Sequence, residues 1–137
     1  MWVRLLRAHG LILRRLRCEL PPDLTFPQFD VLAELDRHPD GLLPSELTKA
    51  LLVTAGNVTG IVRRLEVRGL VERLRVAHDR RAVRVRLTER GRRRAGVALP
   101  GHARALERVL GGTPTPELQA LRESLGALTR ILEAPTP

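Results

Sequence analysis

Residues Gly41 to Thr88 read GLLPSELTKALLVTAGNVTGIVRRLEVRGLVERLRVAHDRRAVRVRLT, two helical patterns followed by two patterns of alternating residues. Thr54 is placed to cap the second helix, and Gly69 suits the left-handed position just beyond a helix end. Between them, one apolar stripe recurs at steps of three and four residues: Val58, Ile61, Val62 and Leu65. The order of the patterns predicts a helix-turn-helix followed by a β-hairpin.

The face opposite this stripe carries short or hydrogen-bonding residues: Gly56, Asn57, Thr59, Gly60, Arg63 and Arg64. Amide, hydroxyl and guanidinium groups are the side chains that bind base edges and phosphates. Each glycine costs a helix about 1 kcal/mol relative to alanine, so the pair favours a surface that another molecule approaches closely. The alternative is an ordinary polar face in contact with solvent.

Two strands are predicted at Val71–Val76 and Val83–Thr88, because apolar and basic residues alternate with a period of two. The loop between them, residues 77–82, contains Asp79 and two arginines. A carboxylate there can orient a guanidinium, and a guanidinium at a hairpin tip suits a narrow minor groove. The alternative is a charged turn that only meets solvent. Together with the helices, the hairpin indicates a winged unit for duplex DNA.

The chain resembles the MarR family of bacterial transcription regulators, and the resemblance covers nearly its whole length. It rests on these elements: Arg64-Leu65-Glu66, Arg68-Gly69-Leu70-Val71-Glu72-Arg73, Asp79-Arg80-Arg81 and Leu87-Thr88-Glu89-Arg90-Gly91, with Pro44-Ser45-Glu46-Leu47 and Val58-Thr59. The resemblance implies a winged-helix homodimer on a palindromic operator, with residues 54–64 in the major groove and Arg81 in the minor groove. The chain departs from the family at Leu43, where a hydroxyl residue is usual.

The predicted fold is mainly α with a small β-hairpin wing, and the helix-turn-helix and its wing occupy residues 25–88. Ser45 and Lys49 lie on the first helix of the DNA unit and are candidate phosphate contacts. The full set of candidate DNA contacts is Ser45, Lys49, Thr54, Gly56, Asn57, Thr59, Arg63, Arg64, Arg75, Asp79, Arg80 and Arg81.

Composition supports a polyanionic partner, since the net charge of the 137 residues is +9. Three aromatic residues are too few for base-stacking platforms, which favours duplex over single-stranded DNA. The single cysteine excludes an internal disulfide and fits a reducing compartment. No apolar run approaches the roughly 20 residues needed to span a bilayer, so we expect a cytoplasmic protein without a membrane partner.

Two helices are predicted before the helix that begins at Pro44. Residues 2–20 form an amphipathic, arginine-rich pattern that favours a packing helix, with a membrane-surface helix as the alternative. Thr25 and Gln28 form a predicted capping box for the next helix, which turns its apolar residues inward: Phe29, Leu32 and Leu35.

Thr88 is predicted to cap a helix that runs from Glu89 toward Leu110. Its basic start, residues 90–94, either contacts phosphate or only meets solvent. The dipeptide Pro100-Gly101 stands where the family has a continuous helix. Because an interior proline costs about 3 kcal/mol or more, we expect a break or sharp bend there.

After a Gly111–Pro114 linker, Thr115 is predicted to cap a last helix with Pro116 at its first position. Its leucines follow steps of three and four residues, as in a coiled-coil seam. We expect residues 1–24 and 89–137 to form a helical dimerisation region intertwined with the DNA unit as one domain; packing within one chain is the alternative. The predicted dimer contacts are Leu6, Leu13, Leu118, Leu121, Leu125, Leu128 and Leu132.

The function expected is that of a sequence-specific regulator, a repressor by preference, bound to a pseudo-palindromic operator. No cofactor or metal is expected, and the resemblance implies a small effector in the crevice between the dimer helices and the DNA unit. Three alternatives stay open: a nonspecific architectural DNA binder, a peroxide sensor based on Cys18 and a winged helix that binds protein rather than DNA. An enzyme is not expected, because the four histidines are scattered and no nucleophile motif is present.

Overall fold

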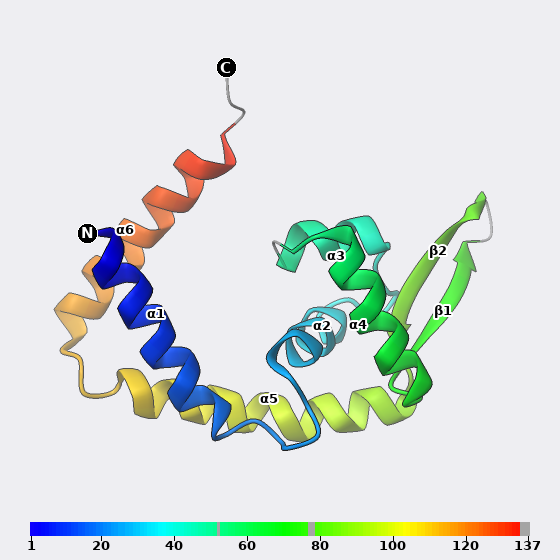
Figure 1. The fold of residues 1–137 in the computed structure, drawn as a ribbon, viewed down its shortest axis with the longest axis horizontal. Helices are drawn as coiled ribbons and strands as arrows, with labels where there is room; N and C mark the ends of the chain where they lie inside the picture. The colour runs from blue at the N-terminus through cyan, green and yellow to red at the C-terminus, as the bar shows by residue number, and fades with distance from the viewer. Residues whose placement is uncertain (52, 77–78, 135–137) are drawn as a thin grey trace.

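The computed structural model describes residues 1–51, 53–76 and 79–134, with the backbone alone at residues 80 and 81. Helices dominate these residues, and the strands form one antiparallel hairpin, so the predicted fold class is confirmed (Figure 1). None of the helices in the described part is long and apolar enough to cross a membrane. The elements are α1 (Trp2–Arg17), α2 (Phe26–Asp36), α3 (Pro44–Leu51), α4 (Ala55–Val67), β1 (Val71–Val76), β2 (Asp79–Leu87), α5 (Glu89–Leu110) and α6 (Thr115–Glu133).

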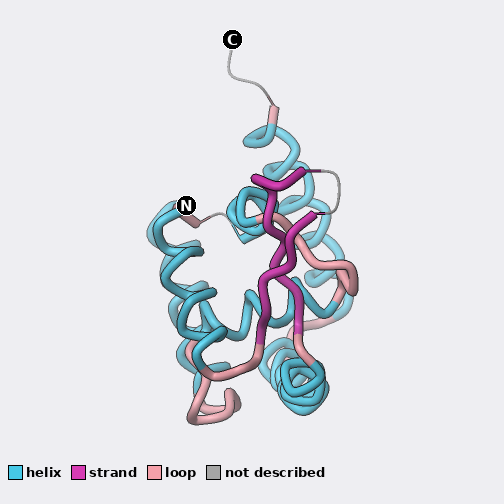
Figure 2. Tube along the Cα trace, turned by 90° about the vertical axis from the view of Figure 1, so that its right-hand side faces the viewer, coloured by secondary structure: helices cyan, strands magenta, loops and turns pink. Residues whose placement is uncertain are grey.

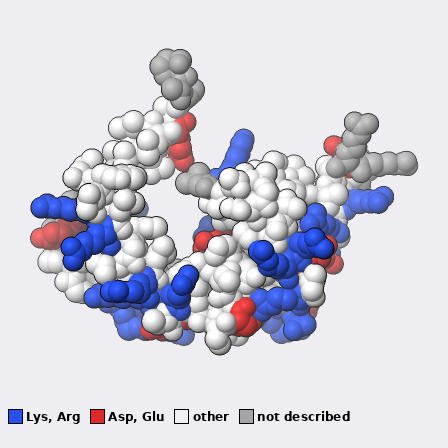
Figure 3. Space-filling view, viewed as in Figure 1, with Lys and Arg blue, Asp and Glu red and all other residues white. Residues whose placement is uncertain are grey.

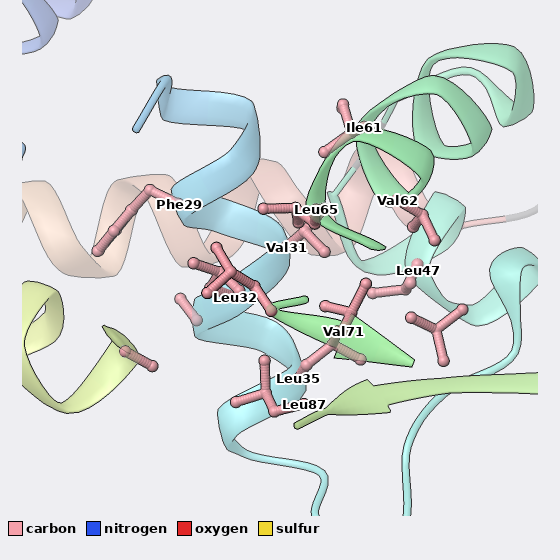
Figure 4. Close-up of a cluster of buried hydrophobic side chains, with 14 of the residues drawn as sticks. Phe29, Val31, Leu32, Leu35, Leu47, Ile61, Val62, Leu65, Val71 and Leu87 are labelled. Carbon is pink, nitrogen blue, oxygen red and sulfur yellow. The ribbon is translucent and has the colours of Figure 1, made fainter. Parts of the chain in front are cut away.

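The hydrophobic core is built around α2, which α4, α3, the hairpin and α5 surround (Figure 4). The three residues of α2 predicted to face inward, Phe29, Leu32 and Leu35, are buried. The apolar stripe of α4 is buried against them, together with Leu47 of α3. Burial of this stripe fixes the rotation of α4 about its own axis, and therefore fixes which of its faces meets solvent.

Local capping chemistry sets where three helices begin. Thr25 and Gln28 form the reciprocal capping box predicted for α2. The Thr54 hydroxyl accepts a hydrogen bond from the Asn57 backbone N–H at the start of α4, and Thr88 caps α5 in the same way. Gly69 follows α4 with φ of 67°, the predicted left-handed position.

The hairpin pairs β1 with β2 from Val71 opposite Leu87 outward, as Figure 2 shows. Strand β2 begins at Asp79, four residues before the predicted start at Val83, so the prediction of a loop through residue 82 is wrong. An irregularity in register between Arg75 and Val76 allows the pairing to continue to Asp79. Backbone hydrogen bonds can extend an exposed hairpin without an apolar alternation.

Helix α5 packs at its start against the turn that follows α4. Gly91 allows this approach, because a Cβ atom there would collide with the Leu70 carbonyl oxygen. The helix then runs through Pro100 to Leu110 as one element, so the predicted break at Pro100-Gly101 is wrong (Figure 1). Pro100 and Gly96 are exposed, so water can hydrate the Gly96 carbonyl that proline leaves without an N–H donor.

The terminal helices depart from prediction at their ends. Helix α1 stops at Arg17 rather than at Leu20, which is buried in the segment that follows. Helix α6 begins at Thr115, with Pro114 in the cap position and no side-chain cap, so Thr115 is not the cap. No residue of α6 is buried, and Figure 1 shows the helix leading away from the core at the far end of α5.

Candidate DNA interface

The polar face of α4 lies in solvent, as the burial of its opposite face requires. Asn57, Thr59 and Arg63 are exposed, and so is Arg64. Among the described residues, the Asn57 side-chain amide forms no hydrogen bond, and neither Arg63 nor Arg64 forms an ion pair. The Thr59 hydroxyl donates to the Ala55 carbonyl oxygen over 3.0 Å, so its oxygen remains available as an acceptor. This face therefore offers amide, guanidinium and hydroxyl groups to a ligand.

Neither glycine on this face is required by the packing of the chain. A Cβ atom at Gly56 would meet nothing within 4 Å, and one at Gly60 would meet only the Arg64 Nη1 atom at 4.0 Å. Alanine would fit both positions and would favour the helix by about 1 kcal/mol each. The two glycines thus leave this face without Cβ atoms, and the contacts of the described fold do not explain the loss of helix stability that they cause.

A groove of about 430 Å³ runs between this face and the start of α2. Figure 3 shows lysine and arginine side chains gathered over α4, the hairpin and the adjoining end of α5. The groove is lined by Thr25, Pro27, Val53, Gly56, Asn57, Gly60, Ile61 and Arg64. Ile61 gives this groove an apolar lining, and Asn57 and Arg64 give it polar groups. It can therefore accept a base edge or a phosphate of the DNA backbone.

Helix α3 presents Ser45 and Lys49 to solvent beside α4. Leu43 lacks a capping hydroxyl, and its backbone N–H instead donates to the Glu46 carboxylate over 2.7 Å. That bond replaces half of a capping box and holds the first turn of α3. In the described part of the chain Lys49 has no ion pair and the Ser45 hydroxyl has no hydrogen bond, so both exposed side chains are available to a phosphate.

Arginines at the base of the hairpin serve a different purpose, because they bind within the chain. Arg73 pairs with Glu66 of α4 over 3.1 Å, and Arg86 pairs with Glu72 over 2.8 Å. Arg84 donates to the Gly41 carbonyl oxygen over 2.6 Å. The Arg73 and Arg84 bonds tie the hairpin to α4 and to the α2–α3 link, so they orient the wing, whereas the Arg86–Glu72 pair joins the two strands to each other.

The predicted contacts at the wing are only partly described. Arg75 is exposed on β1 without an ion pair among the described residues, and Asp79 is exposed at the start of β2. The side chains of Arg80 and Arg81, like residues 77 and 78, lie outside the description, so their contact with a minor groove stays a prediction. Sequence analysis missed Glu66 as the α4 partner of Arg73, and it missed Glu72 as the cross-strand partner of Arg86, which becomes visible only once the strand register is known.

Comparison with known proteins agrees with this geometry. Residues 23–82 match the family model described as the MarR family. Over 112 residues the chain is 37% identical to the HTH-type transcriptional regulator YfiV of Bacillus subtilis, a match that covers 81% of this chain and 69% of that protein. The chain is a member of the MarR family. It is a DNA-binding transcriptional regulator and not an enzyme.

Solved structures extend the similarity to the whole fold. AbsC, a MarR-family regulator of Streptomyces coelicolor, superposes with a TM-score of 0.89 at 24% identity over 98% of this chain and 93% of its own. BpsR of Bordetella bronchiseptica, whose DNA binding is regulated by 6-hydroxynicotinic acid, gives 0.81 at 27% identity over 91% and 95%. FabT of Streptococcus pneumoniae in complex with DNA gives 0.73 at 25% identity over 96% and 93%.

Proposed function

We propose that the protein binds a pseudo-palindromic operator as a homodimer and represses transcription by occupying it. The observation that carries this proposal is the exposed face of α4, where Asn57, Arg63 and Arg64 are unpaired in the described chain beside two glycines that its packing does not require. On this proposal α4 enters the major groove, while Ser45 and Lys49 bind phosphates. The structure of FabT with DNA supports the same use of this fold.

The homodimer is inferred from α6. A helix of 19 residues with no buried side chain has little stability of its own in water. Its seam leucines are exposed, Leu121 by 48% and Leu125 by 43%, and α1 exposes Leu6 by 49%. A second copy of the chain would cover both stripes. We therefore assign residues 1–24 and 89–137 to dimerisation and residues 25–88 to DNA binding.

Two-fold symmetry then sets the operator geometry. Two α4 helices related by a dimer axis bind half-sites about 34–36 Å apart, one turn of duplex. Base contacts from α4 provide selectivity, and phosphate contacts provide most of the affinity and its dependence on salt.

A crevice beside the start of α2 suits a small effector. It has a volume of about 280 Å³ and is lined by Gly10, Leu13, Arg14, Arg17 and Phe26. Two guanidinium groups beside an aromatic ring and a leucine fit a carboxylate with an apolar body. BpsR, regulated by 6-hydroxynicotinic acid, supports an effector of this class. Binding there would change the spacing of the two α4 helices through a shift in population.

Selection of bound duplexes from a random pool tests the function directly. We expect one palindromic motif and an affinity about 10³-fold or more above that for an unrelated duplex at the same salt concentration. Similar affinity for every duplex would instead support the architectural alternative. Sedimentation of the free protein tests the dimer separately, and a stable monomer at micromolar concentration would contradict it.

The surroundings of Cys18 bear on the peroxide-sensing alternative, because this residue lines a recess with Arg15 and Arg108 but also with Glu19. This thiol is exposed and donates to the Arg14 carbonyl oxygen over 3.7 Å. A sensor thiolate needs a cationic partner, and no guanidinium hydrogen bond to its sulfur occurs in the described residues. Operator binding by the Cys18→Ser variant should therefore match that of the wild type, with and without peroxide.

A further inference from the structure

A second cationic site lies where the end of α4 meets the start of α5. It is a recess of about 260 Å³, separate from the groove beside α4, and we call it the arginine recess. Figure 3 shows basic side chains over this end of α5. The recess is lined by Asp23, Arg68, Leu70, Arg90, Arg93, Arg94 and Val97.

Positive charge in the recess exceeds the negative charge around it. Arg68 and Arg94 both pair with the single carboxylate of Asp23. Arg93 pairs with Glu89 over 3.1 Å, but both side chains are 69% exposed, so this pair is weak. Arg90 has no ion pair within the described part of the chain. Among the lining residues, four guanidinium groups face the single carboxylate of Asp23, and Glu89, outside the lining, is shared between Arg92 and Arg93, so positive charge is in excess.

The recess is preformed rather than a chance meeting of long side chains. Asp23 holds the two arginines that are most buried, since the side chains of Arg68 and Arg94 are 31% and 21% exposed. Each keeps N–H groups that Asp23 does not use, because a guanidinium has five donors. A ligand that binds guanidinium groups already held in place loses less side-chain entropy. Leu70 and Val97 add apolar wall to the site.

The recess lies at the end of α4 remote from Asn57. Arg68 is 11 residues from Asn57, about 16 Å along the helix, but only four residues, about 6 Å, beyond Arg64. A free anion and an operator phosphate beside Arg64 can therefore both reach the recess, and the experiment below distinguishes them.

We propose that the arginine recess binds a small anion of the phosphate class, an inorganic phosphate or a phosphate monoester. Its oxygens would accept hydrogen bonds from Arg90 and Arg93 and from the unused donors of Arg68 and Arg94. Planar guanidinium forks match the geometry of phosphate oxygens. This inference does not depend on the dimer or on the effector crevice.

Equilibrium dialysis with inorganic phosphate, at constant ionic strength set with sodium chloride, tests the proposal on the full chain. We expect saturable binding of one anion per chain. Arg90→Gln should weaken it by about tenfold, the effect of losing one charge-assisted hydrogen bond, and adding Arg93→Gln should weaken it further. The matched control is Arg104→Gln, an exposed arginine of the same helix that has no ion pair among the described residues.

Three outcomes would overturn the inference. Binding that does not saturate would show only a diffuse attraction to a basic protein. An equal loss in Arg104→Gln would point to net charge rather than to the recess. A third outcome would assign the recess to the phosphodiester backbone: Arg90→Gln lowers duplex affinity and its salt dependence, while inorganic phosphate fails to bind.

Discussion

Arg68 forms two hydrogen bonds with Asp23, which lies 45 residues earlier in the chain. Its Nη1 atom donates to the Asp23 carbonyl oxygen over 2.8 Å, and its Nη2 atom donates to the Asp23 carboxylate over 2.6 Å. Arg68 is the C-cap of α4, and Asp23 lies in the link between α1 and α2. Arg94 of α5 binds the same carboxylate. One carboxylate, in the α1–α2 link, therefore ties the end of α4, the proposed DNA-binding helix, to the start of α5.

The charge of Asp23 should make stability depend on pH in the acid range. The hydrogen bond from Arg94, aided by the charges of Arg94 and Arg68, lowers the pKa of Asp23 below its ordinary value. A lowered pKa in the folded state stabilises the protein above the unfolded pKa of about 3.9, and this gain is lost as pH falls through the folded value. Asp23→Asn should therefore unfold more easily than the wild type at pH 7, by at most about 1 kcal/mol for a half-exposed pair.

Chemical denaturation at a series of pH values measures this difference. The gap between wild type and Asp23→Asn should narrow below about pH 4 as the wild-type carboxylate becomes protonated. If the difference in free energy of unfolding between the two proteins stayed constant from pH 7 to pH 3, the charge of Asp23 would have no part in that difference.

Charge on the α6 seam should abolish the dimer. Leu125→Asp with Leu128→Asp would place two carboxylates in the proposed interface, where they would lose their hydration. We expect a monomer at micromolar protein concentration in sedimentation and loss of operator binding. Ser124→Asp adds charge to an exposed position outside the seam and should remain a dimer. A dimer that survives in the double variant would exclude the α6 seam as the interface.

The glycines of α4 separate stability from DNA binding. Gly56→Ala should stabilise the free protein by about 0.5–1 kcal/mol, because alanine favours a helix and its Cβ atom meets nothing within 4 Å. The same methyl group should weaken operator binding. Gly96→Ala in α5 has the same open surroundings and should raise stability without any change in affinity. If the Gly56→Ala and Gly96→Ala variants bound the operator with equal affinity, close approach of DNA would not explain why residue 56 is glycine.

The wing prediction rests on sequence alone and needs its own test. If Arg81 binds a phosphate, Arg81→Ala should reduce affinity for all duplexes and lower the salt slope by about one. If it enters the minor groove, the loss should grow with the A·T content of the flanking bases. Titrations at several salt concentrations, on operators that differ only in those flanks, distinguish the two. No change in either quantity would contradict a role for Arg81 in binding DNA.

Features fixed by local chemistry could be predicted from the sequence, and features fixed by distant contacts could not. The capping box of Thr25 and Gln28 needs only residues three apart, and the buried stripe of α4 needs only its own periodicity. The continuity of α5 through Pro100 depends on packing on both sides of it, at Ala95 and at Ala105, which outweighs the cost of one lost hydrogen bond.

The candidate site divides in the same way. Exposure of Asn57 and Arg63 follows from the stripe behind them, so sequence was sufficient to predict it. The partners of Asp23 are 45 and 71 residues away, and no spacing in the sequence brings Arg68 and Arg94 together. The arginine recess was therefore visible before folding only as a basic run at the start of α5.

The ratio of operator affinity to random-duplex affinity in the variant Asn57→Ala with Arg63→Ala is the most direct measurement of whether the exposed face of α4 selects DNA sequence. Each lost bidentate base contact should reduce the preference by about 1–3 kcal/mol, whereas Arg104→Ala should leave it unchanged. An unchanged ratio in the double variant would contradict the assignment of this face to sequence recognition.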